Sequence, residues 1–479
     1  MNVLKVICFF SLLVLAGCDK SPDAAIISGK IEGKSIDSIE YSLPVNGVSF
    51  TGFTGKTAVD SLGNFTISLI MEKPAIISLM GFGSGKKIII EPAQKYDLHI
   101  KADDNNSSLS ITGLNEEGNK LFSELPNPPF LEMELRKYGR NASLDSMKTD
   151  MAAKKAEAIG FFKKLLDEKK VSAKFYDMVG AELDCYYAAL ETLAHYSKMD
   201  FSGNLKEQSA ALDSIYSQYP PDSERLMASS YWYQYADRYI TVYKEIAAGE
   251  YNQEKLREIY EAGKIYTYFV ENSKKNFTGL RLEYFIAAYL YFQSIQKNYE
   301  AELITLYNQF KTDYPDSKYI VFLEPLINEI ADYQKKISAD FSENMKFVPD
   351  YQNINTLKEL ISLFKGKKLY IDIWATWCGP CKTEFKYNKE LKEILKEKGM
   401  ESIYISIDED RNDKQWKDMI KFYSLEGNHV RVNKALDADL RKVFDRDGMI
   451  AIPWYIMVDE NGTIIEKHAK APSQLIKDK

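Results

Sequence analysis

A pair of cysteines between a buried strand and a helix constrains the fold of this chain more than any other sequence feature. The apolar run at residues 369–374 has the length and character of one buried strand, and Cys378 and Cys381 open a helical pattern that ends at Gly399. Further strands are predicted at residues 402–408, 455–459 and 463–467. The alternation of helices and strands predicts an α/β domain over residues 346–479.

The position of Cys378 at the start of a helix favours its thiolate. First-turn amides are unpaired donors with partial positive charge, so the pKa of this thiol is expected to fall from about 8.5 toward 7 or below. Cys381 follows one turn later, near enough to close a disulfide and to resolve a mixed disulfide. Pro380 stiffens the first turn without removing a needed donor. We therefore expect Cys378 to be the nucleophile of a redox pair.

Asp372 lies six residues before Cys378 in the otherwise apolar strand. A buried carboxylate is costly, so its pKa is expected to rise until it is partly protonated near neutral pH. It would then accept the proton of Cys381 when that thiol attacks. The alternative is a solvated or capped aspartate at the end of the strand.

Residues 371–381, Ile-Asp-Ile-Trp-Ala-Thr-Trp-Cys-Gly-Pro-Cys, resemble the thioredoxin superfamily, specifically the TlpA/ResA-like envelope thiol-disulfide oxidoreductases. The resemblance implies a thioredoxin-like fold and a cis proline at Pro453 that packs against the disulfide. It implies no cofactor beyond the cysteine pair, and a part in cytochrome maturation. The implied site residues are the catalytic Cys378, Cys381, Asp372 and Pro453 and the substrate-binding Trp377, Gly379, Pro380 and Ile452.

Two further expectations come from the same resemblance. The family carries an insertion before the cis proline, and residues 409–447 would supply it. The family often has a helix-kinking proline where this chain has Lys386, which predicts a straighter helix here. The closing helix after Ala471 is expected to be short.

The N-terminus has the features of a secretion signal. Residues 1–17 combine a lysine, an apolar run too short to span a bilayer and small residues before Cys18. Leu15-Ala16-Gly17-Cys18 resembles the lipobox of bacterial lipoproteins, which implies an acylated Cys18, a tether over residues 18–23 and a protein anchored to the lipid bilayer of the cell envelope, facing the periplasm. The alternative is an ordinary secretory leader with an incidental cysteine, and the choice between inner and outer membrane stays open.

The remaining sequence predicts two more domains. Short strands between turn signals over residues 24–114 predict a small antiparallel β-sandwich, and helical periodicity over residues 115–345 predicts an all-α domain. The Gly-Lys stretches at 55–57 and 85–87 lack the spacing of a phosphate loop and are interpreted as turns. Four tyrosines spaced by four residues predict a helix seam or, alternatively, a peptide-binding surface: Tyr231, Tyr235, Tyr239 and Tyr243.

The net charge of the chain argues against a nucleic-acid partner, and the positions of its histidines and cysteines argue against a zinc site. The net charge is −7 without a basic stripe, which disfavours a nucleic-acid partner. The four histidines are scattered, and no second cysteine pair completes a zinc site with Cys378 and Cys381. Cys185 lies in a helical pattern and is interpreted as a buried apolar residue.

These features predict a lipid-anchored reductase of protein disulfides. Its substrates would be disulfide-containing envelope proteins, and a membrane thiol reductase would return electrons to Cys378 and Cys381. The Gly-Pro dipeptide between the cysteines favours the reducing direction. The alternative is a lipid-anchored ligand-binding or scaffold protein with a redox-sensing thioredoxin-like appendage.

Overall fold

The computed structural model describes residues 24–82, 85–103, 107–139, 141–444 and 449–478. The predicted signal peptide and tether, with Cys18, lie outside the described residues. Tertiary contacts divide the chain into two compact units with a boundary between Ile327 and Asn328. The division into domains at 114/115 and 345/346 stays a prediction, and each unit is described by itself.

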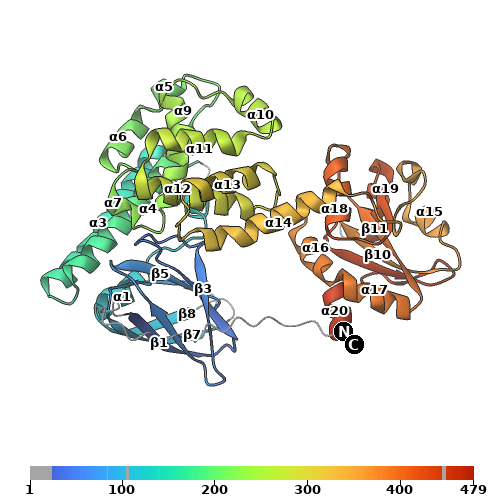
Figure 1. The fold of residues 1–479 in the computed structure, drawn as a ribbon, viewed down its shortest axis with the longest axis horizontal. Helices are drawn as coiled ribbons and strands as arrows, with labels where there is room; N and C mark the ends of the chain where they lie inside the picture. Colours follow the sequence, from blue (N-terminus) through green and yellow to red (C-terminus); the bar gives the residue numbers. More distant parts are fainter. Residues whose placement is uncertain (1–23, 83–84, 104–106, 140, 445–448, 479) are drawn as a thin grey trace. The chain divides into compact units, whose positions relative to one another are not determined.

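Two four-stranded sheets form the start of the first unit (Figure 1). The strands of the first sheet, in the order of their pairing, are β4 (Asn64–Leu69), β1 (Ala25–Glu32), β7 (Lys95–Ala102) and β8 (Ser107–Gly113). Those of the second sheet are β3 (Thr54–Ala58), β2 (Ser38–Ser42), β5 (Ala75–Met80) and β6 (Lys86–Ile90). Alternate residues of β4 are buried, and both sheets contribute to one apolar core. The strand pairs are antiparallel except β1 and β7, which run parallel, so the prediction of a wholly antiparallel arrangement is wrong at that pair.

The sequence does not predict strands β2 and β3 individually. The stretch at residues 55–57, interpreted as a turn, lies within β3 and pairs with β2. Lys86 and Lys87 of the second Gly-Lys stretch likewise lie in β6. Strand β3 is short and carries no large apolar residue, so its backbone pairing with β2 defines it and no side-chain periodicity predicts it.

Helices follow the sheets in the first unit. They are α1 (Glu116–Phe122), α2 (Leu131–Arg136), α3 (Leu144–Asp167), α4 (Ala173–Lys198), α5 (Leu205–Gln208), α6 (Ala210–Gln218), α7 (Glu224–Met227), α8 (Trp232–Arg238), the π-helical η1 (Tyr239–Tyr243), α9 (Lys244–Ala247), α10 (Gln253–Glu261), α11 (Ile265–Asn276), α12 (Gly279–Ile295) and α13 (Glu302–Asp313). The next helix, α14 (Ile320–Ser338), crosses the boundary between the units. The long helices α3 and α4 begin at Ser143 and Ser172, whose hydroxyl oxygens accept hydrogen bonds from first-turn amides.

The helices cover the second sheet on the face opposite the shared core. Ile77 of β5 packs in the core between the sheets, whereas its neighbour Ile76 packs against helical residues such as Phe175. Asn119 of α1 bonds to both backbone groups of Ile89 in the edge strand β6, at 2.7 and 2.9 Å. Both faces of the second sheet are therefore buried, and Asn119 pairs with its edge strand β6. These two features explain why the sheets and the helices form one compact unit.

The four tyrosines do not lie on one regular α-helix. Tyr231 is the N-cap residue of α8, and the π-helical turn η1 follows α8 within a helical stretch that runs on into α9. The rings of Tyr235, Tyr239 and Tyr243 nevertheless all pack around Tyr216 of α6, with centroids 5.1, 4.9 and 4.5 Å away. The prediction of a helix seam is therefore confirmed for these three tyrosines.

A buried ion pair ties β6 to the helices. Lys87 Nζ lies 2.5 Å from Glu182 Oε1 of α4, and the two side chains are 2% and 3% exposed. Ser229 and Ser230 donate hydroxyl hydrogen bonds of 2.6 Å to the same carboxylate. Burial alone would raise the pKa of Glu182, but Lys87 and the serines more than offset it and lower that pKa. Removal of one side chain of this cluster would therefore leave a buried charge or polar atom of another without its partner.

We predict that Lys87→Met lowers the free energy of unfolding of the first unit by about 3–5 kcal/mol, because it leaves the Glu182 carboxylate buried without its counter-ion. Chemical denaturation followed by circular dichroism measures this. The matched control is Lys274→Met, which removes an exposed pair with Glu271 and should cost less than about 1 kcal/mol. Equal losses in the two variants would contradict the assigned role of the pair.

The second unit is a six-stranded sheet with helices on both faces. The strands, in the order of their pairing, are β14 (Ile464–Glu466), β13 (Trp454–Val458), β10 (Lys368–Trp374), β11 (Met400–Ser406), β12 (Gly427–Arg431) and β9 (Met345–Phe347). The helices are η2 (Tyr351–Asn353), α15 (Leu357–Ser362), α16 (Gly379–Glu384), η3 (Phe385–Tyr387), α17 (Asn388–Glu397), η4 (Asp410–Asn412), α18 (Asp413–Phe422), α19 (Lys434–Phe444) and α20 (Pro472–Lys477). Strand β10 pairs parallel with β11 and antiparallel with β13. The predicted α/β architecture agrees with this sheet.

Two helices of this unit can be compared with the predictions: the helix after Cys378 and the closing helix. The helix after Cys378 is not a single α-helix, because the 3-10 turn η3, which contains Lys386, separates α16 from α17. A straighter helix than in the family stays a prediction. Phe385 at this turn is 3% exposed and packs edge-on against Trp374, 5.1 Å between centroids. Phe385 and Trp374 thus pack together at the turn between α16 and α17, where this chain has no proline. The closing helix α20 has six residues, as short as expected.

Candidate active site

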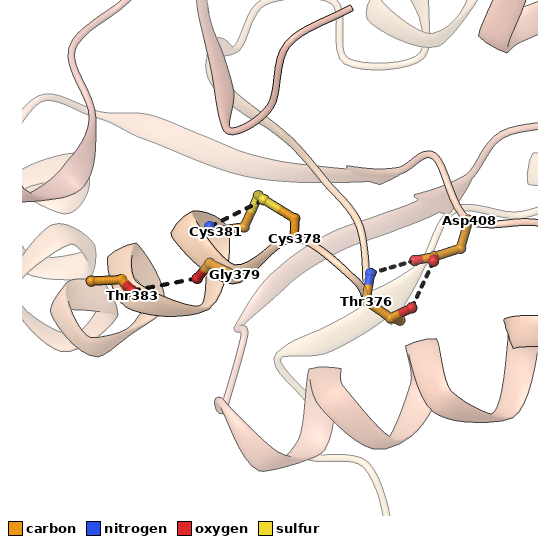
Figure 2. The surroundings of a disulfide bond; sticks show 6 residues. All are labelled: Thr376, Cys378, Gly379, Cys381, Thr383 and Asp408. Carbon is orange, nitrogen blue, oxygen red and sulfur yellow. Dashed lines mark hydrogen bonds between the residues drawn. A yellow bond between two sulfur atoms is a disulfide. The ribbon is translucent and has the colours of Figure 1, made fainter. Parts of the chain in front are cut away.

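Cys378 and Cys381 lie where β10 leads into α16. They form a disulfide, with their Cα atoms 5.3 Å apart, and Cys378 is the N-cap residue of the helix (Figure 2). The backbone N–H of Cys381 donates a hydrogen bond of 3.1 Å to Cys378 Sγ. Pro380 occupies the first turn of α16, where a missing donor costs nothing. A first-turn amide is therefore directed at the sulfur that the sequence identifies as the nucleophile.

The two cysteines differ in their surroundings. Cys381 is fully buried, whereas Cys378 is 4% exposed and lies between the exposed residues Trp377, Gly379 and Pro380. Trp377 is 64% exposed although it is a large, mostly apolar residue. A partner molecule thus meets Cys378 and its exposed neighbours before Cys381.

Asp408 fixes the loop before Cys378, and sequence reasoning missed it. Its carboxylate accepts hydrogen bonds from the Thr376 backbone N–H at 2.9 Å and from the Thr376 hydroxyl at 2.7 Å (Figure 2). Ser406 Oγ donates a third bond of 2.7 Å, and Asp408 is 2% exposed. The available signal was an aspartate at the end of the second predicted strand, residues 402–408, since carboxyl ends of parallel strands meet at one sheet edge.

Asp372 is buried in β10, 1% exposed, so the alternative of a solvated or capped aspartate is wrong. Neither carboxylate oxygen has a hydrogen-bond partner among the described residues. Burial first, and then the negative charge of Glu384, raise the pKa of Asp372 well above its ordinary value. Strand alternation places Asp372 on the same face as Tyr370, the face that α17 and α20 cover. Burial therefore favours the protonated form of Asp372 and makes its ionised form a stronger base than an exposed aspartate.

Pro453 lies at the start of β13, and the peptide bond from Ile452 to Pro453 is cis, as the resemblance implies. Trp454 pairs with Ile373 in the sheet. This register places the cis bond at the end of β10 that leads to the cysteine pair. Ile452 and Pro453 are half-buried, so part of each residue is open to a partner.

The other candidate ligands lie apart. His429 is buried, its Nε2 lies 2.7 Å from the Leu425 carbonyl oxygen, and burial lowers its pKa to about 4. Cys185 is buried in α4, and burial raises the pKa of its thiol. Within the described ranges, no cluster of histidine, cysteine and carboxylate side chains has the arrangement of a metal site. In the same part of the chain, no helix is both long and apolar enough to span a membrane.

Comparison with known proteins gives the family of this unit. The Redoxin family model matches residues 338–477. The thiol-disulfide oxidoreductase ResA of Bacillus thuringiensis subsp. konkukian is 35% identical over 104 residues, which are 22% of this chain and 56% of that protein. ResA of Bacillus subtilis is 27% identical over 132 residues, 28% of this chain and 68% of the relative. The C-terminal unit is a TlpA/ResA-like thioredoxin domain.

This identification confirms the thioredoxin-like fold predicted for the C-terminal α/β region. Among solved structures, a thiol:disulfide interchange protein from Bacteroides sp. is 26% identical, covering 26% of this chain and 74% of that one with a TM-score of 0.21. The chain spans 56% of the length of the first ResA relative. The first unit lies outside the residues that the Redoxin model matches.

We predict that Asp372→Asn changes how stability depends on pH. A carboxyl group whose pKa is raised in the folded state contributes stability below its unfolded pKa and loses it as pH rises through the folded value. The wild-type second unit should therefore lose stability from acidic toward alkaline pH relative to the variant. Denaturant midpoints of the oxidised chain across this range measure the difference.

The control is Glu409→Gln, which removes an exposed carboxylate from the same unit. Its midpoint should differ from that of the wild type by a constant amount across the pH range, because an exposed carboxylate meets similar surroundings in both states. If Asp372→Asn gives the same constant difference, the burial of an ionisable Asp372 is not what the structure indicates.

Proposed function

We propose that this protein is a thiol-disulfide oxidoreductase that reduces protein disulfides in the cell envelope. The observation that carries the proposal is the asymmetric cysteine pair: Cys378 is 4% exposed and lies among exposed residues at the start of α16, whereas Cys381 is fully buried. The ResA relatives support the same class of activity. Without a metal or organic cofactor, the pair itself would carry the two electrons.

The reaction begins with the reduced pair. The Cys378 thiolate attacks one sulfur of a substrate disulfide, so that a mixed disulfide forms and the second substrate sulfur leaves as a thiolate. Cys381 then loses its proton to Asp372 and attacks Cys378 Sγ. The Cys378–Cys381 bond forms, the first substrate sulfur leaves, and both substrate sulfurs take up protons. Two electrons pass from the enzyme to the substrate.

The raised pKa of Asp372 suits it to this step, since a carboxylate with a raised pKa binds a proton more strongly than an exposed one. Its lack of hydrogen-bond partners among the described residues leaves its oxygens free to take a proton. Asp408, in contrast, is held by Thr376 and Ser406 and acts as a positioning residue for the loop before Cys378.

Substrate backbone is proposed to lie along the exposed rim of the pair. Trp377, Gly379 and Pro380 form the rim on one side, and Ile452 with the cis Pro453 forms it at the adjacent strand end. An extended peptide bonds to exposed backbone with little dependence on its sequence. This arrangement suits a protein that acts on several disulfide-containing partners.

The direction and place of the reaction are also proposals. The Gly-Pro dipeptide between the cysteines favours reduction of substrates, and a membrane thiol reductase would then restore the dithiol. Acylation of Cys18 would hold the protein at the bilayer, facing the periplasm. A part in cytochrome maturation rests on the family resemblance alone.

We predict that the purified chain accelerates insulin reduction by dithiothreitol, and that Cys378→Ser lowers the rate to that of dithiothreitol alone. Cys381→Ala should instead accumulate mixed disulfides through Cys378, because no second thiol releases the substrate. Acid quenching followed by non-reducing mass spectrometry detects them. Cys185→Ser is the matched control and should leave the rate unchanged. Equal rates in Cys378→Ser and wild type would overturn the proposal.

A further inference from the structure

A cavity of about 500 Å³ lies within the first unit. The segment between β2 and β3 contributes Phe50, helix α8 contributes Tyr233 and Asp237, and helix α12 contributes Tyr291 and Phe292. The volume is in the range of small-molecule sites. The cavity therefore has room for a ligand of moderate size.

Aromatic rings form the walls of this cavity. The centroid of Phe50 lies 5.4 Å from that of Tyr233 and 5.6 Å from that of Tyr291, both edge to face. Tyr233 and Phe292 are 5.9 Å apart. At Gly52, a Cβ would lie 2.4 Å from the Tyr291 ring, so the absence of a side chain there permits the close approach of this ring.

Tyr233 and Asp237, two residues of α8 that line this cavity, each have one polar atom without a hydrogen-bond partner in the described part of the chain. Asp237 Oδ1 and Tyr233 Oη are shielded from water, and neither forms a hydrogen bond with any residue that the structure describes. They are four residues apart and thus share one helix face. Unpaired buried oxygens of this kind cost free energy. A ligand in the cavity that supplies hydrogen-bond donors would satisfy these oxygens once the two side chains turn toward it.

The charges around the cavity favour a cation. Arg238 also lines it, but its guanidinium is paired with the Glu132 carboxylate of α2. The charges of Arg238 and Glu132 cancel. The ionised Asp237 carboxylate therefore gives the residues that line the cavity a net charge of −1. Burial raises the pKa of Asp237 to about 6, although Arg238 acts in the opposite sense, so the carboxylate is mostly ionised above that pH.

We propose that this cavity binds an organic ammonium ion. Its N–H groups would donate to Asp237 Oδ1 and to the Tyr233 hydroxyl oxygen. The faces of the surrounding rings attract a cation through their quadrupoles, an attraction that strengthens when water is excluded. The site is independent of the disulfide chemistry, and it gives the first unit a ligand-binding function of its own.

The test uses the purified full chain and two probes of similar size, benzylammonium and benzyl alcohol. At about pH 7.5, where the carboxylate is ionised, calorimetry should show benzylammonium binding at least tenfold more tightly than the alcohol. Asp237→Asn should lower the affinity for benzylammonium about tenfold and leave that for the alcohol unchanged. Glu258→Gln, an exposed change on α10, is the matched control and should alter neither affinity.

Acidification gives a second readout. The charged groups facing Asp237 are Arg238 and its partner Glu132, and the tyrosines that interact with it electrostatically, Tyr233 and Tyr289, have pKa values that burial raises well above 10. Benzylammonium affinity should therefore fall about tenfold between pH 7.5 and pH 5, as Asp237 takes up a proton. This loss should be absent in Asp237→Asn.

Three results would overturn the proposal. The first is equal affinity for the two probes, and the second is full benzylammonium affinity in Asp237→Asn. The third is no benzylammonium binding at about 10 mM, which corresponds to a binding free energy weaker than about 3 kcal/mol. Tyr233→Phe removes only the hydroxyl and should weaken benzylammonium binding severalfold while keeping the rings in place. Circular dichroism of each variant checks that the fold is retained.

Discussion

The interaction on which the redox site depends is the one between the unpaired amides at the start of α16 and the sulfur of Cys378. The Cys381 N–H points at that sulfur from 3.1 Å, and the helix adds partial positive charge. This contact exists only while the loop before the helix keeps its path. Asp408 holds Thr376 in that loop through two hydrogen bonds, so the strand end at β11 supports the geometry of the cysteine pair.

Two buried aspartates of the second unit show how surroundings separate the properties of one residue type. Asp408 accepts hydrogen bonds from Thr376 and Ser406, which stabilise a carboxylate in place. Asp372 has no such donors among the described residues, and burial raises its pKa. The first is suited to holding structure and the second to exchanging a proton. The same contrast appears in the first unit, where Glu182 is paired with Lys87 and Asp237 has an unpaired oxygen.

The sequence predicts the site better than it predicts the first unit. The strand before Cys378, the helix after it and the buried Asp372 follow from local patterns of apolar residues, and the structure has all three. Asp408 was missed because it is 32 residues from Thr376, and no local pattern connects them. Strand β3 and the π-helical turn η1 were missed because backbone pairing and packing, rather than periodicity, determine them.

The most direct test of the account is the pKa of the Cys378 thiol in the reduced full chain. The variant Cys381→Ala isolates this thiol from its partner, and alkylation rates measured against pH, with the modified residue identified by mass spectrometry, give the value. The account predicts a pKa clearly below the ordinary value of about 8.5, toward 7, because α16 stabilises the thiolate. A pKa at or above about 8.5 would contradict it.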